Sequence, residues 1–262
     1  MIKAKKSLGQ NFLIDQNIIN KILQVTNIKN KSILEVGPGT GNLTSHIIRH
    51  NPKKIFVIEK DENLAKELSN NFKNEIKVIN NDILMINEKK IDNDELIVFG
   101  NLPYNISTEI LCKWILNLDK SSFWFSCLIL MFQKEVADKI LAKFNTINYG
   151  RISIITNSRL KITNHFNVSQ NSFYPVPKVK STILVFEPFI NRNFKVKDIN
   201  NLEKVSHIFF SKKRKMINKG FKQLFKNPLV IAKKIKINLE LRPSELTENE
   251  YFKITEFFEK QN

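Results

Sequence analysis

The sequence predicts a doubly wound α/β domain followed by a small all-helical domain. Three observations support this prediction. Short apolar runs alternate with amphipathic ones up to about residue 187, a glycine-rich turn follows the first apolar run, and the chain becomes basic and helical after Pro188. A length of 262 residues is enough for one large domain with a smaller one appended. We therefore expect the larger domain to span residues 1–189 and the helical domain residues 190–262.

The strands of the larger domain are predicted by runs that are almost continuously apolar, as strands covered on both faces of a parallel sheet are. They are Ser32–Val36, Ile55–Glu59, Ile76–Asn80, Leu96–Gly100, Cys127–Phe132 and, further on, Ser181–Glu187. Between them, Asp61–Phe72 and Gln133–Phe144 carry apolar residues at helical spacing. This alternation of strands and helices is typical of a doubly wound sheet.

The segment after Pro188 combines helical periodicity with positive charge. From Lys204 to Leu239 there are eleven Lys or Arg residues and no Asp or Glu. Apolar residues recur there at helical spacing; they are Phe210, Ile217, Phe221 and Leu224. We predict basic amphipathic helices, then a last helix within Leu241–Phe258 that begins at Thr247, with Glu250 completing a capping box.

The net charge of +17 and a pI near 9.7 suit a polyanionic partner, either nucleic acid or an anionic membrane. Nucleic acid is favoured because no acid interrupts the basic segment. A solvated surface is the alternative interpretation of such a charge run. We predict phosphate contacts from four consecutive residues, Lys212, Lys213, Arg214 and Lys215.

No targeting or metal-binding pattern is evident. The longest apolar-leaning run, Phe123–Phe132, is too short to span a bilayer, and the basic N-terminus lacks the apolar core of a signal peptide. The cytoplasm is therefore the expected location. Cys112 and Cys127 form no CxxC pair, and the four histidines have no ligand-like spacing. We expect free thiols and no metal.

Polar groups follow three consecutive predicted strands, where a cofactor would bind. Gly37, Gly39 and Gly41 permit a tight turn before a helix and let a ligand approach the backbone closely. Glu59 ends the second strand, 22 residues after Gly37, where an acid can accept hydrogen bonds from both ribose hydroxyls. Asp82 follows the third strand, within reach of an adenine amino group. A dinucleotide and S-adenosylmethionine both suit this crevice, and the glycine spacing favours the second.

The fourth strand ends in Asn101-Leu102-Pro103-Tyr104, which suits methylation of an exocyclic base amine. Such an amine is a poor nucleophile because its lone pair is delocalised into the ring. Two acceptors, the Asn101 side chain and the Leu102 carbonyl, can hold its N–H bonds out of the ring plane, and Pro103 stiffens the loop. Tyr104 can stack on a base flipped out of its helix. This fourth strand end therefore favours S-adenosylmethionine.

Seven short motifs spread over nearly the whole chain form one pattern. They are LGQNFL (8–13), EVGPGTGNLT (35–44), GNLPYNIST (100–108), QKEVADKI (133–140), YGR (149–151), FYPVPKVKST (173–182) and FFSKKRK (209–215). With these motifs the chain resembles the ribosomal RNA adenine dimethyltransferases, the KsgA-like family. The resemblance implies a Rossmann-like S-adenosylmethionine-dependent methyltransferase domain.

The resemblance also implies roles for individual residues. Asn11 and Leu13 would close over the methionine end of the cofactor, while Gly37, Glu59 and Asp82 would bind its nucleoside. We also expect Gly39 and Asn101 to contact the cofactor. The stretch Asn101 to Tyr104 would hold the target adenine, with Phe173 stacking from the other side. From the residues alone, Phe173 suits a core aromatic and Asn11 a helix cap. Two positions depart from the family pattern: Lys60 stands directly after Glu59, and Lys180 stands in PKVKST, where the family often has acids.

We therefore expect an enzyme that dimethylates the N6 of two adjacent adenines near the 3′ end of small-subunit (16S) ribosomal RNA during subunit assembly. S-adenosylmethionine would be consumed and S-adenosylhomocysteine released, with no metal, by a monomer acting on the small-subunit precursor. One alternative is a large-subunit methyltransferase of the antibiotic-resistance type. Others are a non-catalytic ribosome-assembly or nucleic-acid-binding factor and a nicotinamide-dependent dehydrogenase, which would leave Tyr104 and the basic helices unexplained.

Overall fold

The computed structural model describes residues 5, 10–118, 123–189 and 195–261. The chain divides into two compact units. The first comprises Met1–Ala137 and Ile162–Pro188, and the second comprises Asp138–Lys161 and Phe189–Asn262.

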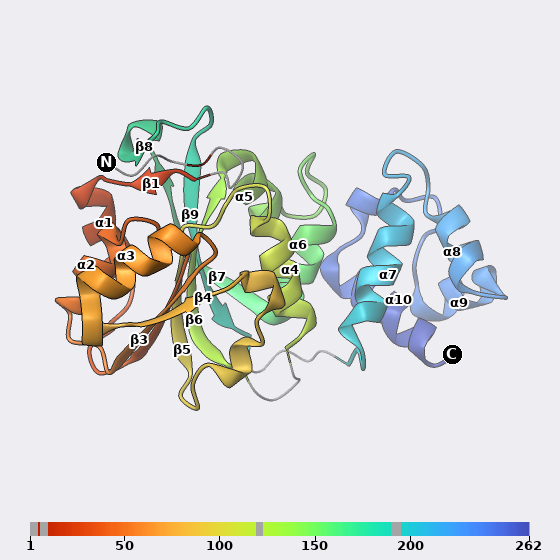
Figure 1. The fold of residues 1–262 in the computed structure, drawn as a ribbon. Helices are drawn as coiled ribbons and strands as arrows, with labels where there is room; N and C mark the ends of the chain where they lie inside the picture. The colour runs from red at the N-terminus through yellow and green to blue at the C-terminus, as the bar shows by residue number, and fades with distance from the viewer. Residues whose placement is uncertain (1–4, 6–9, 119–122, 190–194, 262) are drawn as a thin grey trace. The chain divides into compact units, whose positions relative to one another are not determined.

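The first unit is built on a seven-stranded sheet in the order β4-β3-β2-β5-β6-β9-β7 (Figure 1). Its strands are β2 (Ser32–Val36), β3 (Lys54–Glu59), β4 (Lys77–Asn80), β5 (Leu96–Gly100), β6 (Phe125–Gln133), β7 (Leu160–Val168) and β9 (Ser181–Pro188). The strands from β4 to β6 are parallel, and β9 pairs antiparallel with β6. A separate two-stranded sheet joins β1 (Phe12–Leu13) to β8 (Phe173–Tyr174). The predicted doubly wound α/β fold is confirmed.

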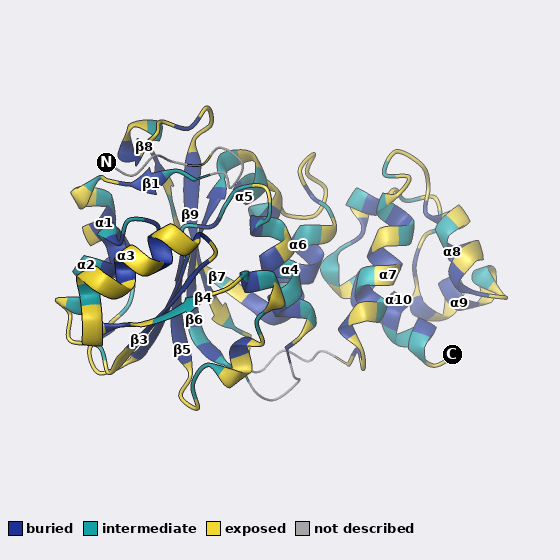
Figure 2. Ribbon diagram, in the orientation of Figure 1, coloured by how far each residue is buried: buried dark blue, intermediate teal, exposed yellow. Residues whose placement is uncertain are grey.

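Helices cover both faces of this sheet (Figure 1). They are α1 (Gln16–Leu23), α2 (Asn42–Ile48), α3 (Glu62–Phe72) and α4 (Ser107–Leu116), followed by α5 (Lys134–Leu141), which crosses into the second unit. The first three lie on one face, where Ile19, Ile47 and Leu68 join strand residues such as Ile33 and Val57 in the main core cluster. Figure 2 shows the central strands buried along their length, as their apolar composition predicts.

The strand order reverses beside β2, and this reversal positions the site. The chain runs outward from β2 through β3 to β4 and then returns to β5 on the other side of β2. Val36 pairs with Gly100, so both strands end level with each other. The loops that follow β2 and β5 therefore diverge from one point and leave a crevice between them, which is where doubly wound sheets bind ligands.

The second unit is helical in its C-terminal part. Its helices are α6 (Arg151–Arg159), α7 (Ile199–Phe210), α8 (Asn218–Leu224), α9 (Pro228–Ile235) and α10 (Glu248–Glu259). Phe209 stacks on Phe221, with ring centroids 5.7 Å apart. The predicted capping box is present, since the Thr247 side chain accepts from the Glu250 amide and the Glu250 carboxylate accepts from the Thr247 amide.

This grouping of residues differs from a single boundary after residue 189. Residues 138–161 leave the first unit through α5, form α6 in the second unit, and return along β7. The physical reason is packing, because α6 contacts α7 and α10 of the C-terminal segment. In the sequence, this excursion has the same alternating pattern as the rest of the α/β domain.

Candidate functional site

A pocket opens at the carboxyl ends of the parallel strands. Four stretches supply its lining: an N-terminal segment, the turn after β2, the ends of β3 and β4, and the loop after β5. The lining includes Gln10 to Leu13, Gly37 to Thr40, Glu59, Lys60, Asp82, Leu84 and Asn101 to Ile106. The structure thus brings together nearly all the side chains that the sequence assigned to a cofactor and to the base amine.

The glycine turn brings the backbone close to its neighbours. Gly37 and Gly39 have φ angles of 71° and 58°, in the left-handed region that favours glycine. A Cβ atom at Gly37 would lie 3.1 Å from the Asn101 carbonyl oxygen, and one at Gly39 would lie 2.7 Å from the Phe12 ring. The turn therefore touches both the N-terminal strand and the loop after β5, and a side chain at either glycine would separate them.

Glu59 ends β3 with a carboxylate that is almost fully buried. One oxygen accepts from the Gly39 amide at 3.2 Å and the other from the Asp61 amide at 2.9 Å. Burial raises the pKa of Glu59, and these two backbone hydrogen bonds oppose the rise. The carboxylate is thereby fixed in one orientation, and each oxygen keeps a second lone pair that can accept from a ligand.

Glu35 is a second acid in the pocket, and the sequence analysis did not single it out. It lies inside β2, is fully buried, and accepts a 2.6 Å hydrogen bond from the Thr44 hydroxyl. Burial raises its pKa to about 7, and the neighbouring Glu59 contributes to the rise. A signal was available: an acid within a run predicted to be buried on both faces is expensive unless it has partners or a function.

Asp82 forms an ion pair with Lys60, one of the two residues that depart from the family pattern. Its Oδ2 lies 2.7 Å from the Lys60 ammonium, and its Oδ1 accepts from the Leu84 amide at 3.0 Å. The hydrogen bond from Lys60 is the largest cause of a lowered Asp82 pKa. Asp82 is therefore ionised and already neutralised by a lysine at the pocket wall.

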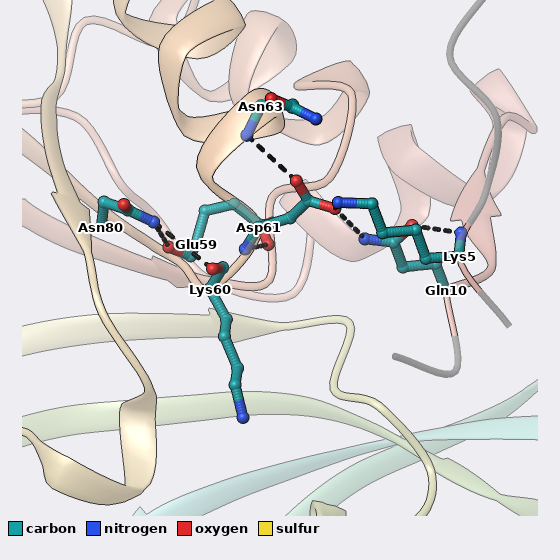
Figure 3. Close-up of polar contacts among 7 residues, drawn as sticks. All are labelled: Lys5, Gln10, Glu59, Lys60, Asp61, Asn63 and Asn80. Carbon is teal, nitrogen blue, oxygen red and sulfur yellow. Dashed lines mark hydrogen bonds and ion pairs between the residues drawn. The ribbon is translucent and has the colours of Figure 1, made fainter. Parts of the chain in front are cut away.

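The corner after β3 is tied to the N-terminal segment (Figure 3). Asp61 accepts from the Lys5 ammonium at 2.7 Å and from the Gln10 amide group at 3.4 Å, and the Lys5 backbone amide donates to Gln10. The Asn80 side chain donates to the Glu59 carbonyl at 2.8 Å. These contacts hold the backbone around Glu59 from both sides.

The N-terminal strand also fixes the loop after β5. The Asn101 NH₂ group donates to the Asn11 carbonyl at 3.0 Å, and the Asn42 NH₂ group donates to the Leu13 carbonyl at 2.8 Å. The other end of the Asn101 amide, its Oδ1, is an acceptor. The Asn11 carbonyl, 90 residues away in the sequence, thus holds the NH₂ end of the Asn101 side chain.

Within that loop, the four residues differ in exposure. Leu102 is buried, while Asn101, Pro103 and Tyr104 are half-buried and line the pocket. The hydroxyl groups of Tyr104 and Ser181 form a hydrogen bond, and burial raises the pKa of Tyr104. The ring is therefore tethered at its hydroxyl end to β9.

The structure places Phe173 outside the pocket lining. Its ring is 1% exposed, belongs to the main core cluster and does not line the pocket. Phe173 pairs with Leu13, and the alternation of side chains along β8 turns it inward and its neighbour Tyr174 outward. In this structure the Phe173 ring presents no open face on which a base could stack.

The basic run 212–215 lies in the second unit and differs in two ways from its prediction. It forms turns between α7 and α8 and is not helical. Lys212, Arg214 and Lys215 extend from these turns, whereas the Lys213 ammonium donates to the carbonyls of Ile147 and Tyr149, at 2.7 and 3.0 Å. Lys213 therefore has a structural partner.

Metal-binding clusters and membrane-spanning helices are both absent from the described part of the chain. Within it, no group of three or more His, Cys, Asp or Glu side chains is arranged to hold a metal ion. None of the helices described above is long and apolar enough to cross a bilayer.

Sequence relatives cover nearly the entire chain. A model of the family "Ribosomal RNA adenine dimethylase" matches residues 1–260. The "Ribosomal RNA small subunit methyltransferase A" of Pelagibacter ubique (strain HTCC1062) is 53% identical over 258 residues, which is 98% of each chain. The protein of the same name from Mycoplasmopsis synoviae (strain 53) is 38% identical and covers 90% of this chain and 89% of its own.

Two solved structures share the fold of this chain. A dimethyladenosine transferase from Plasmodium falciparum superposes with a TM-score of 0.81 at 27% identity, covering 95% of this chain and 98% of that one. The 23S rRNA methyltransferase ErmE superposes with a TM-score of 0.69 at 21% identity, covering 95% and 100%, and shows the fold alone. The match to nearly every residue and the shared fold lead to one conclusion: the chain belongs to the ribosomal RNA adenine dimethylase family.

Proposed function

We propose that this protein transfers methyl groups from S-adenosylmethionine to the N6 of two adjacent adenines near the 3′ end of small-subunit (16S) ribosomal RNA. The observation that carries the proposal is the Asn101 amide, held by its NH₂ group at the wall of the pocket. The two relatives given above, one of them 53% identical, are both named as small-subunit methyltransferases. Their names favour the small-subunit substrate over a large-subunit one.

The pocket's chemistry fits S-adenosylmethionine. The turn at Gly37 and Gly39 leaves no room for side chains, and Glu59 offers carboxylate lone pairs suited to ribose hydroxyls. Asp82 offers acceptors to an adenine amino group beside its ion pair with Lys60. Asn11, Leu13 and Asn101 complete the set of residues that would hold the cofactor, which supplies an electrophilic methyl group on a sulfonium.

The chain's own residues would orient the base amine. Asn101 Oδ1 and the Leu102 carbonyl would accept hydrogen bonds from its two N–H groups. This arrangement favours a pyramidal nitrogen whose lone pair is free for in-line transfer. Pro103 restricts the loop, and the Tyr104 ring, tethered through Ser181, packs against the base. The proton leaves to water after transfer, so no strongly basic side chain is required.

The proposed partner is the small-subunit precursor with its RNA, and the proposed site of action is the cytoplasm, with the enzyme acting as a monomer. The basic turn 212–215 would contribute phosphate contacts through Lys212, Arg214 and Lys215. A second, non-catalytic role on the same particle would need neither the Asn101 geometry nor the acceptors around it.

The test is labelled methyl transfer to immature small subunits, naked small-subunit RNA and large-subunit RNA. Asn101→Ala should slow transfer at saturating S-adenosylmethionine at least about a hundredfold, a larger loss than any change in cofactor affinity, since it removes a group that orients the reacting amine. Asn93→Ala, at an exposed amide before β5 that does not line the pocket, is the matched control and should be near normal. A near-normal single-turnover rate for Asn101→Ala would exclude this residue from the mechanism, and transfer to large-subunit RNA alone would overturn the substrate assignment.

A further inference from the structure

An exposed aromatic residue stands beside the pocket and has no role in the site described above. Tyr174 is 53% exposed, while Phe173 next to it is 1% exposed. It ends β8, and the β8–β9 loop that follows it is largely exposed (Figure 2). Val176 and Val179 in the loop are also exposed, so Tyr174 belongs to a group of exposed apolar side chains that is a candidate contact for a partner.

Strand pairing places Tyr174 at the rim of the pocket. In the antiparallel β1–β8 pair, Tyr174 lies directly opposite Phe12. Directly opposed residues project from the same face of a sheet, with Cβ atoms about 5 Å apart. Phe12 itself lines the pocket and packs on Gly39 of the cofactor turn. Tyr174 is thus one side chain away from the pocket, within the same compact unit.

Hydrogen bonds at both ends hold this loop in place. The Gln170 side chain donates to the Pro177 carbonyl at 3.0 Å, and the Lys134 amide donates to the Lys180 carbonyl at 2.9 Å. Before the loop, the Ser172 hydroxyl donates to the Asp15 carboxylate at 2.9 Å. A surface anchored in this way can bind without a large ordering cost.

The charge around Tyr174 identifies the kind of partner. Lys178 and Lys180 are exposed in the same loop. The sequence between Asp138 and Glu187 holds no Asp or Glu, and Asp15, the acid that contacts Ser172 beside this loop, is one negative charge against two lysines. Proteins bind single-stranded nucleic acids with this combination of an exposed aromatic ring and nearby lysines, because bases stack on the ring and phosphates contact the cations.

We propose that Tyr174 is a stacking platform for an unpaired nucleotide next to the target adenines, and that Lys178 and Lys180 contact the adjoining phosphates. This inference rests on the proposed function and adds a subsite to it. A platform beside the pocket would hold the flanking strand while the target base enters. It would act on RNA affinity and leave the reacting atoms untouched.

The test uses the substrate on which the wild-type protein transfers methyl groups. Tyr174→Ala should raise the KM for RNA about five- to a hundredfold with kcat within about twofold, as expected when one stacked base is no longer held. Tyr174→Phe keeps the ring and should restore the wild-type KM. Phe144→Ala is the matched control, because Phe144 is an aromatic of nearly equal exposure, 52%, that does not line the pocket.

A second readout separates stacking from other effects. A short single-stranded RNA with two adjacent adenines and 2-aminopurine beside them should show fluorescence quenching with wild type and Tyr174→Phe, and less with Tyr174→Ala. Unchanged KM and quenching in Tyr174→Ala would overturn the proposal, as would an equal effect of Phe144→Ala. A weakening seen with ribosomal particles but not with naked RNA would also overturn it, in favour of a protein partner. Failure of the wild type to methylate any RNA would instead count against the proposed function.

Discussion

At the scale of single residues, the pocket depends on how a few polar groups are held. Glu59 is fixed by two backbone amides, Asn101 by the Asn11 carbonyl, and Asp82 by Lys60. Most of these partners come from another segment of the chain, so the orientation of each group follows from the fold. The residue types alone identified the groups but not what orients them.

Glu59→Gln should weaken S-adenosylmethionine binding by about 1–3 kcal/mol, because a neutral amide replaces a charged acceptor. In the wild type, the amides of Gly39 and Asp61 each donate to one of the two Glu59 oxygens. The NH₂ group of the variant cannot accept either hydrogen bond. Isothermal calorimetry measures the change. Glu62→Gln, in an exposed acid three residues later, is the control and should leave the affinity unchanged. Equal affinities for both variants would refute the ribose assignment of Glu59.

Glu35 gives the folded protein a distinctive pH dependence. Burial raises its pKa from 4.5 to about 7, so the folded chain keeps a proton that the unfolded chain releases between these values. This contribution makes the free energy of unfolding fall as pH rises from 4.5 to about 7, by ~1.4 kcal/mol per unit at most. Glu35→Gln lacks the effect. The melting temperature of Glu35→Gln relative to that of wild type should therefore rise between about pH 5 and about pH 8. A difference that stays constant with pH would show that Glu35 titrates normally.

At the scale of elements, strands that end together make the site, and turns carry the surface charge. Val36 and Gly100 pair at the ends of β2 and β5, which brings the glycine turn against the Asn101 loop. The basic run 212–215 joins α7 to α8. Its four side chains differ in their surroundings because a turn points them in several directions.

The members of this basic turn should separate into two classes. Replacing Lys212, Arg214 and Lys215 with Ala should lower RNA affinity and flatten its salt dependence, by a log–log slope of about one for each phosphate that is no longer bound. Thermal stability should barely change, since none of these three side chains is buried. Lys213→Ala should instead lower the melting temperature, because its ammonium bonds the Ile147 and Tyr149 carbonyls.

Filter binding across a salt series and thermal melts of both variants make the comparison. Parallel salt lines for wild type and the triple variant would mean that the turn is a solvated surface. An unchanged melting temperature for Lys213→Ala would mean that its two hydrogen bonds contribute nothing measurable to stability.

At the scale of the whole molecule, the sequence was informative where patterns are strong and local. β2 and β5 have the predicted limits because short, largely apolar runs specify buried strands. β7 was not predicted because it is an edge strand whose middle is mostly exposed, and two-residue strands such as β8 leave no periodicity.

The site was predictable to a similar extent and for the same reason. Gly37, Glu59, Asp82 and Asn101 each lie at or just after a strand end, so topology alone brings them to one edge. The buried Phe173, the ion pair on Asp82 and the bonding of Lys213 depend on contacts between distant segments. No local pattern encodes such contacts.

The close approach of Gly37 to the Asn101 carbonyl has a consequence for protein engineering. The glycine turn and the Asn101 loop approach so closely that a Cβ at Gly37 would lie 3.1 Å from the Asn101 carbonyl oxygen. A laboratory redesign that enlarged the glycine turn, the proposed cofactor side, to accept a bulkier donor would therefore shift the Asn101 loop, the proposed acceptor side, as well. New donor specificity and retained adenine selectivity should have to be selected together, with paired changes in both loops.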